Sequence, residues 1–177
     1  DVHGVFCDTG GAGAGWVVRV EKLHRWAESH GIKTHIVTSI GMAELVRIKK
    51  GFPGNAQQFC TGHLKGIPFL QWIDEADKEC RAKVLVGKRR VESEARKDTP
   101  EFVEGSEYHG GRTLWHPLYL HTDAMRNKLV HRGGWEVLPH RSKECSPCVN
   151  ANRADFLALS NGAIERVNDL EVEIGHP

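Results

Sequence analysis

Residues 2–39 read VHGVFCDTGGAGAGWVVRVEKLHRWAESHGIKTHIVTS and decide the fold class. The mostly apolar residues 2–7 predict a short strand, and a glycine-rich loop follows it. Apolar residues then recur at three- and four-residue spacing over 16–30, which predicts an amphipathic helix ended by Gly31. The β-branched residues of 33–39 predict a second strand. The stretch is therefore expected to form a strand–helix–strand unit.

The rest of the chain continues this alternation. Strands are expected over residues 83–87 and 113–118, and a charged loop or short helix over 88–100. We expect further helices over 42–50, 60–76, 122–130, 151–159 and 163–170 and an irregular segment over 132–146. Strands that alternate with helices indicate an α/β fold with a mainly parallel sheet. Ligands of such sheets bind beyond the carboxyl ends of the strands.

Composition and charge narrow the class of protein. The 177 residues are 40% hydrophobic and 27% charged, which is typical of a globular domain. A net charge of +1 argues against a nucleic-acid binder that depends on bulk charge, although it permits a local basic patch. No apolar run approaches the roughly 20 residues of a membrane span. Five cysteines without a secretion signal indicate reduced thiols or metal ligands in a cytoplasmic protein.

The segment Cys145-Ser-Pro-Cys148 is the sharpest chemical motif. Two cysteines separated by two residues can place both sulfurs on one metal ion or cluster. A redox-active dithiol and a pair of ordinary buried thiols are the alternatives. Further ligands could come from Cys60, Cys80, His63 or His140.

Two other segments suit the binding of an anion or a nucleotide. Gly87 allows close approach of the backbone, and the guanidinium groups of Arg89 and Arg96 suit phosphate or sulfate. Glu92 could orient an arginine, and Ser93 could donate to an oxyanion; the alternative is a solvated charged face. Asp8, Thr9 and Gly10 end the first strand, where a carboxylate could bind a ribose or a metal ion and the glycines could cradle phosphate. The alternative there is a flexible turn.

Five segments in this order resemble elements of the phosphoadenosine phosphosulfate reductase family, within the adenine nucleotide alpha hydrolase superfamily. The resemblance spans residues 2–160. The segments are Phe6-Cys-Asp-Thr-Gly10, Cys60-Thr-Gly-His-Leu-Lys65, Gly87-Lys-Arg-Arg-Val-Glu-Ser-Glu-Ala-Arg96, Trp115-His-Pro-Leu118 and Cys145-Ser-Pro-Cys148.

The resemblance implies a doubly wound, mainly parallel sheet with helices on both faces, in a single domain over residues 1–177. It implies that ATP or another adenine nucleotide binds at Asp8, Thr9, Gly10, Gly87, Arg89, Glu92, Ser93 and Arg96. It further implies a [4Fe–4S] cluster held by Cys60, Cys145 and Cys148, with Cys80 or His63 as candidates for the fourth ligand. Zinc is the alternative metal, since thiolates bind both.

The chain departs from the family pattern in three places, and one of them is His121, which replaces the family's tryptophan after the Pro-Leu strand. The family's pyrophosphate loop, S-G-G-x-D-S, is not in the sequence, and we expect it, with a first strand, upstream of Asp1. The family's catalytic cysteine near the C-terminus is also missing.

From the resemblance as a whole, we expect a nucleotide-dependent enzyme of sulfur or redox chemistry, with DNA or RNA as a candidate substrate. The alternatives are a zinc-stabilised binding module without catalytic activity and a true sulfonucleotide reductase.

Overall fold

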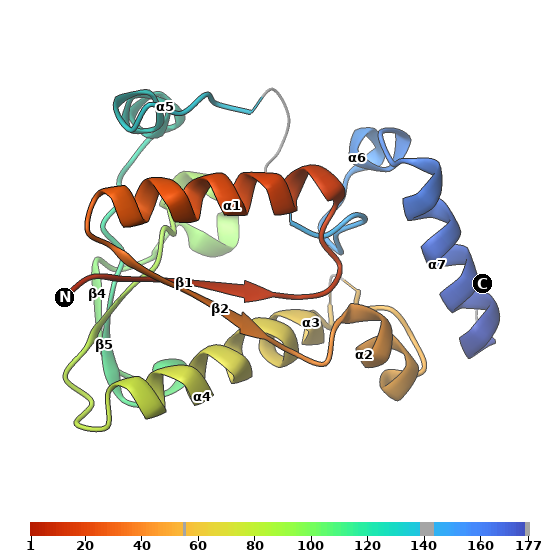
Figure 1. Ribbon diagram of the computed structural model, residues 1–177, viewed down its shortest axis with the longest axis horizontal. Coiled ribbons are helices and arrows are strands. Elements are labelled where there is room, and N and C mark those ends of the chain that lie inside the picture. The colour runs from red at the N-terminus through yellow and green to blue at the C-terminus, as the bar shows by residue number, and fades with distance from the viewer. Residues whose placement is uncertain (55, 139–143, 176–177) are drawn as a thin grey trace. The chain divides into compact units, whose positions relative to one another are not determined.

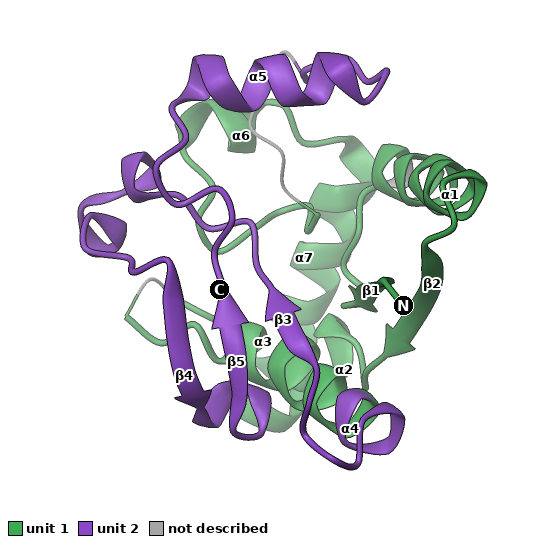
Figure 2. Cartoon of the chain, turned by 90° about the vertical axis from the view of Figure 1, so that its left-hand side faces the viewer, with its two compact units in different colours: residues 1–72, 143–177 green, residues 73–142 purple. Residues whose placement is uncertain are grey.

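A computed structural model of the chain describes residues 1–54, 56–138 and 144–175 (Figure 1). The chain divides into two compact units, coloured separately in Figure 2. The first unit contains residues 1–72 and 143–177, and the second contains residues 73–142. His140 and part of the segment expected to be irregular lie outside the described residues.

The first unit is built on the predicted strand–helix–strand stretch. Strands β1 (His3–Asp8) and β2 (Lys33–Thr38) pair in parallel, and helix α1 (Ala14–Ser29) connects them. Gly31 has a φ of +73°, a conformation that glycine adopts without a steric cost, and it ends the helix as predicted. All three elements agree with the sequence prediction to within about two residues, the usual uncertainty of element boundaries.

Helices complete the first unit. The helix predicted over 60–76 forms as three consecutive pieces, and its middle piece has the wider π geometry. The helices are α2 (Met42–Lys49), α3 (Phe59–Thr61), the π-helix η1 (Gly62–Gly66), α4 (Ile67–Ala76), α6 (Arg153–Leu157) and α7 (Asn161–Ile174). Helix α4 continues into the second unit. Leu45 and Val46 of α2, Leu64 of η1 and Ala163 of α7 are almost fully buried and form the apolar core of this unit.

The second unit contains a three-stranded sheet of order β3–β5–β4. Strands β3 (Lys83–Leu85) and β5 (Arg112–Trp115) are parallel, whereas β4 (Phe102–Ser106) is antiparallel to β5. Three short 3₁₀-helices and helix α5 surround the strands. These are η2 (Arg90–Glu92), η3 (Glu94–Arg96), η4 (Glu107–His109) and α5 (Asp123–Arg132).

Arg112 anchors this sheet to the end of α4. Its side chain is fully buried, and it donates hydrogen bonds to the carboxylates of Asp74 and Asp77, each at 2.7 Å. It also donates to the main-chain oxygens of Ile73 and Asp77. The hydrogen bond from Arg112 holds the pKa of Asp77 below its usual range, and the backbone N–H of Ala82 lowers it further. The buried guanidinium is therefore neutralised and hydrogen-bonded within its own unit.

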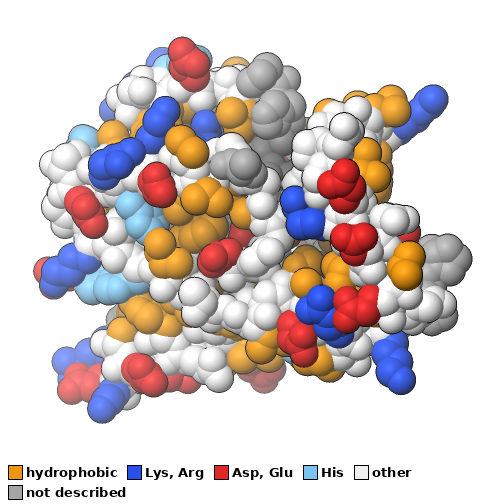
Figure 3. All heavy atoms as spheres, turned by 45° about the vertical axis from the view of Figure 1, so that its right-hand side comes forward, with side chains coloured by type: hydrophobic (Ala, Val, Ile, Leu, Met, Phe, Trp, Pro, Cys, Tyr) orange, Lys and Arg blue, Asp and Glu red, His pale blue; other side chains and the backbone are white. Residues whose placement is uncertain are grey.

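The observed fold is a mixed α/β arrangement with small parallel and mixed sheets. Among the helices of the described residues, none is both long enough and apolar enough to span a membrane. On the face drawn in Figure 3, acidic and basic side chains are interspersed with hydrophobic ones. That face does not present the continuous basic surface that binding by bulk charge requires.

Candidate functional site

The buried carboxylate of Glu144 brings three of the predicted segments together in the first unit. Its Oε1 accepts hydrogen bonds from the Thr9 hydroxyl at 3.0 Å and from the Thr9 backbone N–H at 3.3 Å. Its Oε2 accepts from Lys65 Nζ at 2.6 Å. Glu144 is only 8% exposed, and Thr9 is 1% exposed. The residues that follow β1, the π-helix and the start of the Cys145–Cys148 segment thus share one ion-pair network.

Backbone hydrogen bonds hold the glycine-rich loop against the same segment. Gly13 N–H donates to Glu144 O at 3.1 Å, and Ser146 N–H donates to Gly11 O at 3.0 Å. The Asp8 carboxylate, Oδ1, accepts from Gly10 N–H at 2.9 Å, so this side chain closes a local turn. The N–H groups of Gly10 and Gly13 therefore donate hydrogen bonds within the protein.

Gly10 is required by the geometry of this loop. Its φ is +64°, and a Cβ built on it would lie 3.1 Å from the Cα of Gly41. Both the backbone conformation and the close approach of the loop before α2 exclude a larger side chain here. Gly10 therefore has a structural reason to be glycine, besides the nucleotide role predicted for it.

The thiols of this unit lie near the Glu144 network. Cys145 Sγ is 3.4 Å from Thr9 Oγ1, and burial raises the pKa of the Cys145 thiol. Cys7 Sγ lies 3.6 Å from the main-chain oxygen of Lys65, and burial raises the pKa of this thiol as well. Neither environment favours the reactive thiolate of an activated nucleophile.

Cys60 lies on α3 and is half-buried. Gln58 Nε2 donates to Asn150 Oδ1 at 3.1 Å, which joins the segments that carry Cys60 and Cys148. The thiols of Cys60, Cys145 and Cys148 are donors of the kind that a [4Fe–4S] cluster requires. In the part of the chain that the structure describes, however, no three His, Cys, Asp or Glu side chains are grouped closely enough to hold a metal ion.

The two candidates for a fourth ligand are both exposed. His63 lies on η1, in the first unit. Cys80 lies in the second unit, between α4 and β3, with a φ of +53°. The donor chemistry therefore suits a cluster, whereas the described residues do not form a closed four-ligand site.

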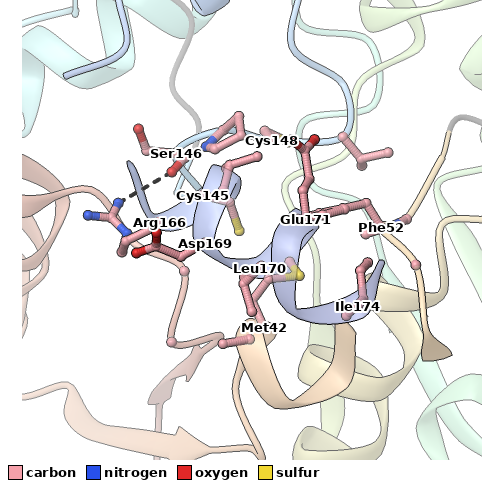
Figure 4. Close-up of a pocket in the computed structure, with 18 of the residues that line it drawn as sticks. Met42, Phe52, Cys145, Ser146, Cys148, Arg166, Asp169, Leu170, Glu171 and Ile174 are labelled. Carbon is pink, nitrogen blue, oxygen red and sulfur yellow. Dashed lines mark hydrogen bonds between the residues drawn. The ribbon is translucent and has the colours of Figure 1, made fainter. Parts of the chain in front are cut away.

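A pocket of about 660 Å³ opens beside the cysteines, within the first unit. Gly10, Gly11, Cys145 and Cys148 line one part of it. Figure 4 shows Met42 of α2 and several side chains of α7 around the rest. The volume lies in the range of about 300–1,000 Å³ that is typical of small-molecule sites. Both cysteines of the Cys145–Cys148 segment therefore border a space large enough for a small molecule.

The second unit holds the predicted anion-binding segment in an ion-pair network of its own. Arg89 is only 5% exposed, and all three of its guanidinium nitrogens have partners. Its Nε donates to Glu92 at 3.2 Å, and its Nη1 donates to the main-chain oxygen of His121. Its Nη2 forms an ion pair with Asp123 at 3.0 Å. Arg96 pairs with Glu92 as well and is half-exposed. Arg89 would have to exchange these partners to bind a phosphate, whereas Arg96 can reach a ligand from the surface.

The remaining predicted residues of this segment lie nearby. Gly87 and Ser93 are exposed, and the side chain of Glu92 connects the two arginines. The Glu92 carboxylate thus forms ion pairs with both arginine side chains. The structure brings Arg89, Glu92 and Arg96 together, and separately it brings Thr9 and Cys145 together.

The sequence reasoning gave no role to Glu144. Its position directly before Cys145 was the one available signal, because a carboxylate beside a cysteine pair has to be neutralised if it is buried. Lys65 belongs to the Cys60–Lys65 segment, but the sequence gives no sign of its partner, 79 residues further along the chain. Arg166, Asp169 and Glu171 line the pocket and were not singled out either.

No model of a known protein family matches this chain, and no curated protein matches it. A functional assignment therefore rests on the residues and geometry of the chain itself.

Proposed function

We propose that this chain is an adenine-nucleotide-dependent enzyme similar to the phosphoadenosine phosphosulfate reductase family. It acts in the cytoplasm, in sulfur or redox chemistry at a thiolate-held iron–sulfur cluster, with DNA or RNA as a candidate substrate. The proposal includes the doubly wound, mainly parallel sheet that such enzymes have.

The observation that carries the proposal is the network around Glu144. Three segments that resemble family motifs lie far apart in the sequence, yet one residue from each lies in this network. Thr9 and Lys65 donate hydrogen bonds to the Glu144 carboxylate, and the Cys145 thiol lies beside the Thr9 hydroxyl. A cysteine pair that only packs against its own surroundings does not require hydrogen bonds to two other segments that resemble family motifs. The Lys65–Glu144 ion pair fixes the start of the cysteine segment, and the Thr9 hydroxyl lies beside the Cys145 thiol.

In this proposal Cys60, Cys145 and Cys148 hold the cluster, and Cys80 or His63 is the candidate for a fourth ligand. The cluster, when bound, would supply electron transfer or a site for sulfur. The protein contributes the half-buried surroundings of these thiols, which limit the access of water. The exposed Arg96, with Gly87 and Ser93 beside it, would bind the phosphate or sulfate of the nucleotide, and Glu92 would orient Arg96.

Metal and sulfide analysis of anaerobically purified protein tests the cluster. We expect iron and acid-labile sulfide in near-equal amounts, with broad absorbance near roughly 400 nm. Cys148→Ser should lose both, whereas Cys7→Ala, which removes a thiol outside the predicted ligand set, should retain them. Zinc without sulfide would instead support the zinc-stabilised binding module, and absence of any metal would contradict both readings.

Binding of ATP tests the nucleotide site separately. We expect Arg96→Ala to weaken binding by about tenfold or more, since a charge-assisted hydrogen bond to phosphate contributes roughly 1.5–3 kcal/mol. Lys97→Ala is the matched control, because the neighbouring Lys97 is also an exposed cation that is paired with a glutamate, Glu94. Equal losses in the two variants would show a general charge effect and contradict the site. Turnover of a sulfonucleotide with a thiol reductant would favour the reductase alternative.

A further inference from the structure

The lining of the pocket beside the cysteines is largely apolar and includes two aromatic side chains. Phe52 follows α2 and is 37% exposed, and Phe156 of α6 is 53% exposed. Met42 and Leu170 add further apolar surface (Figure 4). Solvent-exposed phenylalanines that line a pocket of this volume suit the flat faces of a planar ring.

Most of the charged side chains that line the pocket are carboxylates, which accept hydrogen bonds. Arg47 is already paired with Glu173 through two hydrogen bonds, at 2.7 and 3.1 Å. Arg166 donates to the main-chain oxygen of Ser146 (Figure 4). Asp169 and Glu171 bring two further carboxylates, so the lining holds more acidic than basic groups. A ligand that complements this lining carries N–H donors and no concentrated negative charge.

We propose that this pocket binds a nucleobase that carries an exocyclic amino group, as in adenine or cytosine. The ring packs against the apolar and aromatic side chains, and the amino group donates to Asp169 or Glu171. A polyphosphate is disfavoured by the same carboxylates. The base therefore belongs to a nucleoside or to a nucleic-acid strand whose phosphates point away from α7.

This inference deepens the proposed function and rests on it in one respect. Cys145 and Cys148 line the pocket, so a base bound there lies beside two of the residues proposed to hold the cluster. The base would then be the substrate of the enzyme. Its binding, however, depends only on the side chains of the pocket and can be measured without turnover.

Titration calorimetry with cytidine and uridine is the direct test, because the two differ by an amino group in place of a carbonyl. We expect cytidine and adenosine to bind about tenfold more tightly than uridine, the difference made by one hydrogen bond to a charged acceptor. A short single-stranded oligonucleotide and ATP complete the series. Tighter binding of the oligonucleotide identifies nucleic acid as the source of the base. Binding of ATP that persists in Arg96→Ala and is lost in Phe156→Ala would overturn the exclusion of polyphosphate from this pocket.

Variants of the lining identify the site. The combined change Asp169→Asn and Glu171→Gln should remove the preference for cytidine over uridine. Phe156→Ala should weaken both nucleosides. Glu165→Gln on α7 and Leu157→Ala on α6 are matched controls, since neither residue lines the pocket.

Equal affinity for cytidine and uridine in the unaltered protein, or unchanged affinities in the lining variants, would overturn the assignment of this pocket. The result is separable from that of the proposed function. Selective nucleoside binding by protein without metal would retain the pocket and remove the cluster chemistry. A protein that holds an iron–sulfur cluster but binds no nucleoside would do the reverse.

Discussion

Single residues in this protein organise segments that lie far apart in the sequence. Glu144 is the clearest case, because one buried carboxylate receives the Thr9 hydroxyl, the Thr9 N–H and the Lys65 ammonium. A buried carboxylate is tolerated only when such partners surround it. In the second unit the buried residue that joins separate segments is a cation, Arg112, which donates hydrogen bonds to the carboxylates of Asp74 and Asp77.

We expect Glu144→Gln to destabilise the protein by about 1–2 kcal/mol, because the amide keeps a hydrogen bond with Thr9 but leaves Lys65 without its counter-charge. Thermal unfolding would measure the effect. Glu165→Gln removes an exposed carboxylate and should leave the unfolding temperature unchanged. Equal stability of the two variants would show that the network around Glu144 does not stabilise the first unit.

The ion pair of Asp77 with Arg112 predicts a defined acid dependence. Because the folded protein holds the pKa of Asp77 below its usual value of 3.8, ionised Asp77 stabilises the folded state above that pH. This stabilisation is lost as the pH falls through the lower pKa of the folded state. Asp77→Asn should therefore be less stable than the unaltered protein at neutral pH, and the difference should shrink on acidification below about pH 4. A difference that stays constant down to pH 3 would contradict this account.

At the scale of helices and strands, the sequence predicted best where a local signal was strong. The apolar spacing of α1, the glycine after it and the β-branched residues of β2 led to correct elements. Strand β4 was not predicted, because Phe102-Val-Glu-Gly-Ser is short and contains Gly105 at a φ of +61°, where its pairing with β5 shifts register. The π-helix within the predicted helix over 60–76 also has no local signature.

The same limit applies to the candidate site. The cysteine motif, the end of β1 and the Arg89–Arg96 segment could be found because each is a local pattern. The hydrogen bonds that join Thr9 to Glu144 span 135 residues, and the pocket is assembled from five or more separate segments. Such contacts depend on tertiary packing, which spacing along the chain does not encode.

Helix α5 depends on its N-terminal cap more than on burial. None of its residues is buried, and the Thr122 hydroxyl accepts a hydrogen bond from Met125 N–H at 3.3 Å. Thr122→Ala should cost about 1 kcal/mol of local stability, which amide hydrogen exchange in the first turns of α5 would detect. Thr122→Ser keeps the hydroxyl and should restore protection. Equal exchange in the alanine and serine variants would show that the cap is dispensable.

At the scale of the whole molecule, the chain divides into two units with separate cores, and a disturbance of one core should stay local. Ala163 of α7 is 1% exposed, so Ala163→Glu places a charge in the core of the first unit and should destabilise that unit by roughly 2 kcal/mol or more. Hydrogen exchange should then accelerate in α2 and α7, while β3, β4 and β5 keep their protection. Equal acceleration in both units would show that they unfold as one.

The first unit is built from two stretches of the chain that the second unit separates, and this limits the order in which the protein can fold during synthesis. A ribosome releases β1, α1 and β2 early, but Glu144 and α7 emerge only after all the residues of the second unit. Until then Thr9 and Lys65 lack their carboxylate partner, and the nascent first unit exposes apolar surface that α7 later covers. The second unit can complete its sheet during that interval. Residues 1–72 can therefore reach their final structure only after Glu144 and α7 have been translated.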